Sequence, residues 1–144
     1  HDAEPRRMAD LSARAARADL EVRVLDAAVT QAPYDLVLVD APCSGSGTWR
    51  RTPDAKWRLT PDRLADLQAL QDLILDAAAP LVGPSGHLAY ATCSILREEC
   101  NDRVAAFLDR NPGWETLDRF CVPPRERGDG FFQTVLRRSG PAMA

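Results

Sequence analysis

The sequence has no long hydrophobic run, no CxxC pair and no excess of positive charge. About 18 consecutive apolar residues are needed to cross a bilayer, so the first absence argues against a membrane protein. The spacing of the four cysteines fits no zinc-binding pattern. A net charge of −3 gives no general attraction to nucleic acid, so any such binding requires a local basic patch or another domain.

The start of the chain also lacks a methionine and the basic-then-apolar pattern of a secretory leader. Without a leader, the four cysteines are expected to be reduced thiols in a cytoplasmic protein. The first residues look like the end of a strand, and we therefore expect the chain to be a fragment of a longer protein.

The composition is that of a globular domain, with 45% hydrophobic and 27% charged residues in a chain of 144. Apolar runs typical of strands alternate with helical patterns, which predicts an α/β sheet with flanking helices. We expect a domain over residues 1–138 and a flexible tail at 139–144. The predicted strands are 21–25, 36–39, 87–92, 116–121 and 131–138, and the predicted helices are 2–18, 60–79 and 97–110.

Two sequence patterns give these elements more detail. The helix at 60–79 begins with Thr60 and Pro61, a good N-cap and first turn, and its predicted buried face is Leu64, Leu67, Leu70, Leu73, Ile74 and Ala77. The run from Leu36 to Val39 is typical of a strand that is buried on both faces of a parallel sheet.

The stretch after this run carries the groups that suggest chemistry. Asp40 follows at the carboxyl end of the strand, where open α/β sheets bind their ligands. Pro42, Cys43 and two glycines then form a loop. This arrangement places a carboxylate and a thiol at one edge of the sheet and indicates an active site.

A second predicted strand also ends in a cysteine, Cys93. Because parallel strands have their carboxyl ends at the same edge, the thiols of Cys43 and Cys93 are expected to face one cleft. A single free cysteine is most often a small buried hydrophobic residue. Two cysteines at equivalent strand ends, one of them beside an acid, favour a functional role.

These motifs resemble a known family, the RNA cytosine-5 methyltransferases of the bacterial 16S ribosomal RNA methyltransferase B and Nop2/Sun type. The resemblance is carried by Asp40-Ala-Pro-Cys-Ser-Gly-Ser-Gly-Thr, Arg50-Arg-x-Pro-Asp-x-Lys-Trp57, Ala91-Thr-Cys-Ser94 with Glu98-Glu99, and Asp129-Gly-Phe-Phe132. It implies the C-terminal part of a Rossmann-like class I catalytic domain that acts on RNA, most simply 16S ribosomal RNA. A transfer-RNA substrate and a non-catalytic RNA-binding or assembly module remain alternatives.

The resemblance implies a role for each residue of the predicted active site. Cys93 is the nucleophile that adds to C6 of the cytosine, which makes C5 reactive toward a methyl donor. Cys43 assists breakdown of the covalent adduct, and Asp40 binds the N3/N4 edge of the base. In DNA cytosine-5 methyltransferases the Pro-Cys cysteine is the nucleophile instead, so chemistry alone does not rank the two thiols.

The resemblance also implies S-adenosylmethionine as the cofactor. Asp2 matches an acid that contacts the ribose hydroxyls, and Asp26 matches an acid near the adenine. Asp40 and Pro42 complete the predicted cofactor site. An exposed helix-capping aspartate is an equally simple interpretation of Asp2. Gly45 and Gly47 are expected to permit close approach of RNA or cofactor.

A basic cluster beside the active-site loop is expected to contact RNA phosphates, although such clusters are usually solvated surface. Its predicted RNA-binding members are Arg50, Arg51, Lys56 and Arg58. Trp57 in the same segment either stacks on a base or anchors the core.

The family's cofactor-binding glycine loop and N-terminal RNA-binding part have no counterpart in this sequence. In the strand order 3-2-1-4-5-7-6 of such methyltransferases, the chain supplies strands 3, 4, 5, 6 and 7. The strand at 36–39 then lacks its central neighbour and has an apolar edge that invites self-association. We expect the chain alone to be inactive and to bind the cofactor weakly.

Overall fold

The computed structural model describes residues 1–27, 31–125 and 128–139, which form two compact units, residues 1–32 and 33–144. The first unit contains a 3₁₀ helix, η1 (Pro5–Met8), and a short helix, α1 (Leu11–Arg17). The helix expected at 2–18 therefore forms as two pieces. Residues 140–144, most of the predicted tail, lie outside the described residues.

The strand expected at 21–25 does not form. Val22 and Val24 are 45% and 50% exposed, and no strand of the described residues pairs with this segment. Alternating apolar residues favour a strand only where a neighbouring strand supplies hydrogen bonds and a surface to pack on. This prediction was wrong because the apolar pattern is a local feature of the sequence, whereas strand formation requires a partner strand from elsewhere in the chain.

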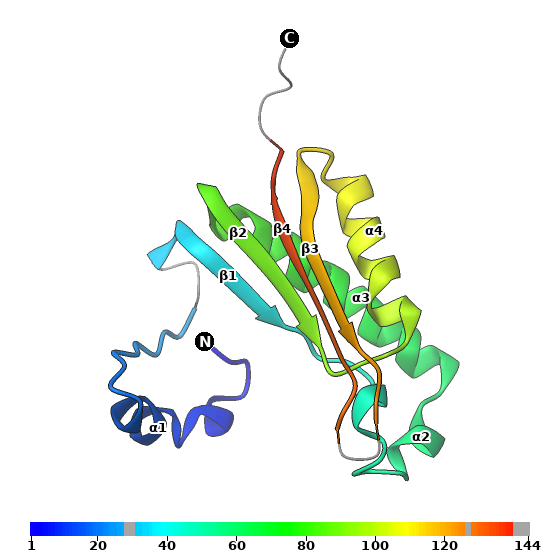
Figure 1. Cartoon of the computed structure of the whole chain (residues 1–144). Helices are drawn as coiled ribbons and strands as arrows, with labels where there is room; N and C mark the ends of the chain where they lie inside the picture. Colours follow the sequence, from blue (N-terminus) through cyan, green and yellow to red (C-terminus); the bar gives the residue numbers. More distant parts are fainter. Residues whose placement is uncertain (28–30, 126–127, 140–144) are drawn as a thin grey trace. The chain divides into compact units, whose positions relative to one another are not determined.

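The second unit is built on a four-stranded sheet with the order β1-β2-β4-β3 (Figure 1). Its strands are β1 (Tyr34–Asp40), β2 (Val82–Thr92), β3 (Trp114–Val122) and β4 (Phe131–Arg138). Strand β1 pairs with β2 in parallel, and β4 is antiparallel to both of its neighbours. This is the order 4-5-7-6 of the expected methyltransferase sheet, which confirms the predicted fold class.

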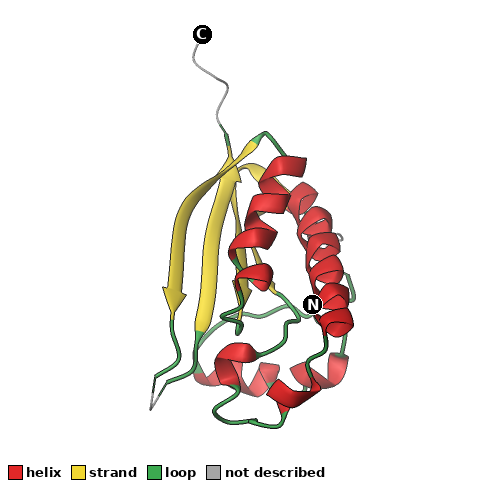
Figure 2. Ribbon diagram, turned by 90° about the vertical axis from the view of Figure 1, so that its right-hand side faces the viewer, coloured by secondary structure: helices red, strands yellow, loops and turns green. Residues whose placement is uncertain are grey.

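Two helices, α3 (Pro61–Ala78) and α4 (Asn101–Arg110), lie on the same face of this sheet (Figure 2). Helix α3 starts as expected, because the Thr60 side chain accepts a hydrogen bond from the Arg63 N–H at 3.2 Å and Pro61 fills the first turn. Shorter pieces are α2 (Ala55–Arg58), η3 (Ser46–Thr48), η4 (Ala79–Leu81) and η5 (Arg97–Glu99). No helix in the described part of the chain has the length and apolar character needed to cross a membrane.

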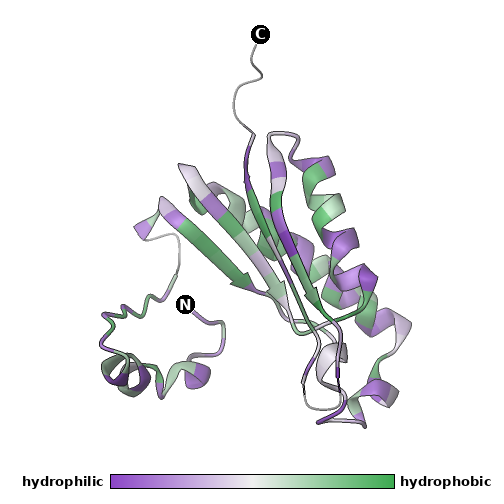
Figure 3. Cartoon of the chain, viewed as in Figure 1, coloured by the Kyte–Doolittle hydropathy of each residue, from purple (hydrophilic) through white to green (hydrophobic). Residues whose placement is uncertain are grey.

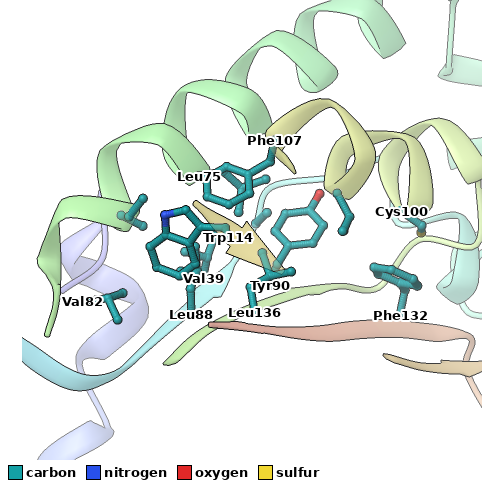
Figure 4. Packing of buried hydrophobic residues seen from close by; sticks show 14 residues of the cluster. Val39, Leu75, Val82, Leu88, Tyr90, Cys100, Phe107, Trp114, Phe132 and Leu136 are labelled. Carbon is teal, nitrogen blue, oxygen red and sulfur yellow. The ribbon is translucent and has the colours of Figure 1, made fainter. Parts of the chain in front are cut away.

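The core lies between the two helices and the sheet (Figure 4). Leu75 of α3 and Phe107 of α4 pack with Tyr90, Leu136 and other residues of the strands. The buried face of α3 differs from the predicted one: it is Leu67, Gln71, Leu75 and Ala78, while Leu70 and Leu73 are exposed. Leucines occur on several sides of this helix, so they do not define its inner face.

Strand β1 is buried on one face only, which corrects the expectation of burial on both. Val39 belongs to the core, whereas Leu36 and Leu38 are 59% and 62% exposed. Alternate residues of a strand point to opposite faces, and α3 and α4 cover only the face of Val39. Strand β1 is also the first in the strand order and so forms one edge of the four-stranded sheet. Figure 3 shows in green that this edge strand is largely apolar.

Candidate active site

The two predicted thiols lie next to each other. Strands β1 and β2 are parallel neighbours, and Asp40 is paired with Ala91, so Cys43 follows three residues after this pair on one chain segment and Cys93 two residues after it on the other. Their Sγ atoms are 3.4 Å apart, within hydrogen-bond distance for sulfur. The Ala41 N–H donates to the Ala91 carbonyl at 3.0 Å, which keeps the two strand ends paired at the point where the loops begin.

The pair is electrostatically unequal. The pKa of Cys93 is lowered to about 7, chiefly because Cys43 donates a hydrogen bond to the Cys93 sulfur. The pKa of Cys43 is raised by that same hydrogen bond and by burial. The opposite shifts make Cys93 the more acidic thiol of the pair and so favour it as the nucleophile.

Asp40 stands at the exposed end of β1 beside this pair. Its charge raises the pKa of Cys93, which is the effect expected of a neighbouring carboxylate. The arrangement brings together two thiols of unequal acidity and an acid at one end of two parallel strands.

A buried glutamate, Glu99, connects the two cysteine loops. It is fully buried at 0% exposure. Its Oε1 accepts hydrogen bonds from the Ser44 N–H at 2.8 Å and from Gln71 Nε2 at 3.1 Å. Its Oε2 accepts from Ser94 Oγ at 2.7 Å and from Ser44 Oγ. Ser44 and Ser94 each follow one of the paired cysteines directly.

Further hydrogen bonds lock the same loops together. Ser46 Oγ lies 2.9 Å from Ser94 Oγ and accepts from the Ile95 N–H at 2.9 Å. Gln71, on α3, also donates to the Pro42 carbonyl at 2.8 Å. The loop after β1 is thus tied both to the loop after β2 and to the helix that covers them.

The glycines of the first loop serve contacts within this chain. Gly45 has φ of +67°, a left-handed conformation that favours glycine. Gly47 donates to the Cys93 carbonyl at 2.9 Å and accepts from the Gly130 N–H at 2.8 Å. A Cβ on Gly47 would lie 2.2 Å from the Gly130 oxygen. At Gly47, the close approach that was expected of RNA or cofactor is made by two other loops of the protein.

The basic segment lies on the surface and carries local ion pairs. Arg50 and Arg51 contact Asp129 at 3.5 and 2.8 Å, and Arg58 contacts Asp54 at 2.8 Å. Lys56 Nζ lies 5.5 Å from the centre of the Trp57 ring. Trp57 is 82% exposed, which excludes the core-anchoring interpretation of this residue.

The predicted cofactor residues are divided between the two units. Asp40 and Pro42 belong to the thiol site, whereas Asp2 and Asp26 lie in residues 1–32. Asp2 is half-buried and accepts a hydrogen bond from the Glu4 N–H at 2.7 Å, and Asp26 is exposed. Among the described residues, no cluster of three His, Cys, Asp or Glu side chains is arranged to hold a metal ion.

Sequence reasoning missed the network that holds the loops, namely Ser44, Ser46, Gln71, Ser94 and Glu99. One signal was present: each paired cysteine is followed by a serine. A second was Gln71, which lies one turn from Leu67 and Leu75 on the buried face of α3. A polar residue on such a face usually has a buried hydrogen-bond partner.

Comparisons with known proteins show which family the chain resembles. Residues 2–137 match the family described as 16S rRNA methyltransferase RsmB/F. The ribosomal RNA small subunit methyltransferase B of Salmonella agona (strain SL483) is 43% identical over 111 residues, which are 72% of this chain. The chain spans about a quarter of that relative's length, 26%.

Two solved structures share the fold. The crystal structure of PH0851 has a TM-score of 0.81 at 32% identity, covering 95% of this chain and 36% of that one. The structure of NSun6 from Pyrococcus horikoshii with SFG has a TM-score of 0.78 at 20% identity, covering 97% and 41%. The second likeness shows the fold alone.

Proposed function

This chain belongs to the 16S rRNA methyltransferase RsmB/F family, and on that premise we propose that the protein containing it methylates C5 of a cytosine in 16S ribosomal RNA. The observation that carries the proposal is the 3.4 Å pairing of Cys43 with Cys93 beside Asp40. The pair offers an activated nucleophile and a second thiol at the same place. Such a reaction would take place in the cytoplasm.

Cys93 acts as the nucleophile in this proposal. Its thiolate forms a bond to C6 of the cytosine, and the electron pair displaced from the C5–C6 double bond makes C5 nucleophilic. Asp40 binds the N3/N4 edge and stabilises the charge that develops there. S-adenosylmethionine, when bound, supplies the electrophilic methyl group that C5 takes up.

Cys43 serves the second half of the reaction. The proton on C5 must leave, and its bonding electrons must re-form the double bond as the sulfur of Cys93 departs from C6. Both the hydrogen bond to Cys93 and the negative charge there raise the pKa of Cys43. Covalent attachment of Cys93 removes that charge and lowers the pKa of Cys43, so Cys43 becomes able to help remove the proton once the adduct exists.

The residues proposed to contact the cofactor are Asp2 and Asp26 in residues 1–32, and Asp40 and Pro42 in residues 33–144. A carboxylate can accept hydrogen bonds from the two hydroxyl groups of a ribose. One oxygen of Asp2 accepts from the Glu4 N–H, and a carboxylate has further acceptor positions for a ribose. The Pro42 carbonyl is held by Gln71, which fixes the start of the loop next to Asp40.

The RNA-binding side chains in this proposal are Arg50, Arg51, Lys56 and Arg58. All four are exposed and follow directly on the thiol loop, where the phosphates around an extruded base would pass. Trp57 is highly exposed, and an exposed aromatic ring is suited to stacking on an unpaired base.

A methyl-transfer assay on the full-length protein tests the proposal. Cys93→Ala is expected to abolish methylation of 16S ribosomal RNA, and Cys43→Ala is expected to accumulate a covalent protein–RNA adduct. Cys121→Ala, an exposed cysteine outside the pair, is the control. Methylation of transfer RNA in place of 16S ribosomal RNA would contradict the proposed substrate. Full activity of Cys93→Ala would contradict the proposed role of Cys93 as the nucleophile.

We further propose that the 144-residue chain by itself associates through the edge of β1 and binds S-adenosylmethionine weakly, without activity. An edge strand with exposed Leu36 and Leu38 is a template for pairing with a second copy. Sedimentation is expected to show dimers or larger species that Leu38→Lys dissociates. A monomer that persists at all concentrations would contradict the proposed self-association. Micromolar cofactor affinity by calorimetry would contradict the proposed weak binding.

A further inference from the structure

We propose that Glu99 is a positioning residue that sets the distance between the two thiols. It contacts neither sulfur in a hydrogen bond, but it binds the residue that follows each of them, Ser44 and Ser94. The two serine hydroxyls share one oxygen, Oε2, so the loops cannot separate without breaking a hydrogen bond to the carboxylate. The structural part of this proposal is independent of the proposed function; only its consequence for catalysis rests on that function.

The position of the carboxylate is itself fixed from several directions. The Tyr90 hydroxyl donates to the Glu99 carbonyl at 2.8 Å, and the Glu99 N–H donates to the Leu96 carbonyl at 3.0 Å. Gln71 reaches Oε1 from α3. The side chain is therefore anchored to the sheet, to its own turn and to the covering helix, and it can transmit that rigidity to both loops.

A space-filling role alone does not account for this residue. Burying a carboxylate is unfavourable unless hydrogen bonds compensate for the lost hydration. Here the four donors are all neutral: one backbone N–H, one amide and two hydroxyls. An apolar residue of similar size would fill the same volume without that cost, but it could not hold Ser44 and Ser94 together.

The charge of Glu99 and its geometry have opposite consequences for the thiols. The negative charge raises the pKa of both Cys43 and Cys93, whereas the hydrogen bonds hold them close enough for Cys43 to lower the pKa of Cys93. Glutamine in place of Glu99 keeps the shape: its oxygen can accept at Oε1, and its amide can donate to the two hydroxyls at Oε2. Glu99→Gln therefore removes the charge and retains the link.

The test uses the whole chain and needs neither RNA nor a methyl donor. Diamide oxidises two neighbouring thiols to a disulfide, and its N=N bond takes up the two hydrogens. The measured quantities are the rate of Cys43–Cys93 disulfide formation, by peptide mapping, and the pH profile of Cys93 alkylation by iodoacetamide. The variants are Glu99→Ala and Glu99→Gln, with the exposed neighbour Glu98→Gln as the matched control.

We expect Glu99→Ala to slow formation of this disulfide by about tenfold or more, since small displacements of reacting groups have large effects on rate. Glu99→Gln is expected to restore the rate and to move the alkylation profile of Cys93 to lower pH. Glu98→Gln is expected to change neither quantity. A purely structural residue would give the loss in Glu99→Ala without the shift in the glutamine variant.

Three results would overturn the proposal: a wild-type disulfide rate in folded Glu99→Ala, no rescue by glutamine, or an unshifted profile in that variant. If Glu99→Ala does not fold, Ser94→Ala decides the matter, because it removes the hydrogen bond from the Cys93 loop to Glu99 and leaves the bonds of Glu99 to Ser44 in place. A wild-type rate in folded Ser94→Ala counts against the link. In the full-length enzyme the expected effect of Glu99→Ala is a lower kcat with unchanged KM for the cofactor. If the wild-type protein proves not to methylate RNA, the proposed function fails, but the thiol measurements still test the role of Glu99.

Discussion

Two regions of the chain differ sharply. The thiol corner is formed by residues 40–48 and 91–99, and the basic segment is residues 50–58. In the corner, Ser46, Ser94 and Glu99 are buried and bound to one another across elements far apart in sequence. In the basic segment, the side chains are exposed and pair with near neighbours or with Asp129. The fold therefore fixes the geometry of the groups that we propose to react, whereas the side chains proposed to contact RNA are held only by surface contacts.

The largest effect is expected from Gly47→Ala in the corner. The new Cβ would lie 2.2 Å from the Gly130 oxygen and 2.9 Å from the Cys93 oxygen, both of which are backbone atoms. Overpacking against backbone costs about 3 kcal/mol or more, so a large fall in Tm is expected. Gly113→Ala, where a Cβ meets nothing within 4 Å, is the control. Equal stability of the two variants would show that the corner is not interlocked as described.

The next effect concerns the chemistry of the corner. Cys43→Ala removes the main cause of the lowered pKa of Cys93, which should rise from about 7 toward the ordinary 9.0. Because only the thiolate reacts, alkylation of Cys93 at pH 7 should slow by a factor on the order of fifty. The pH profile measures this directly. An unchanged profile would mean that Cys43 does not activate Cys93; Cys121→Ala should leave the profile unmoved.

This contrast also explains what the sequence could predict. The proximity of Cys43 and Cys93 could be predicted from two apolar runs that are each followed by a cysteine, because parallel neighbouring strands have their carboxyl ends at the same edge of the sheet. The role of Glu99 did not follow, since its burial depends on partners in three separate segments. The exposure of Leu36 and the missing strand at 21–25 were mispredicted for the same reason: burial and pairing depend on what lies across the sheet.

A smaller effect is expected in the basic segment. Trp57→Ala removes an exposed ring, and stacking on a base is worth about 1–3 kcal/mol, so RNA affinity of the full-length protein should fall roughly tenfold. Tm should not change, because the ring is not part of the core. Phe120→Ala, which removes an exposed aromatic side chain of β3, is the matched control in filter binding. A fall in Tm without loss of affinity would place Trp57 among the structural residues.

The smallest effect tests the link between the two regions. Asp129 precedes Gly130, which packs on the thiol loop, and its carboxylate pairs with Arg50 and Arg51 of the basic segment. Surface ion pairs contribute about 0–1 kcal/mol, so Asp129→Asn should leave Tm nearly unchanged. If these arginines contact phosphate, releasing them from the carboxylate should tighten RNA binding a few-fold at low salt, and the gain should shrink as salt is added. Weaker binding would instead show that Asp129 holds the two arginines in position for RNA. The basic segment would then be preorganised by the fold, as the thiol corner is.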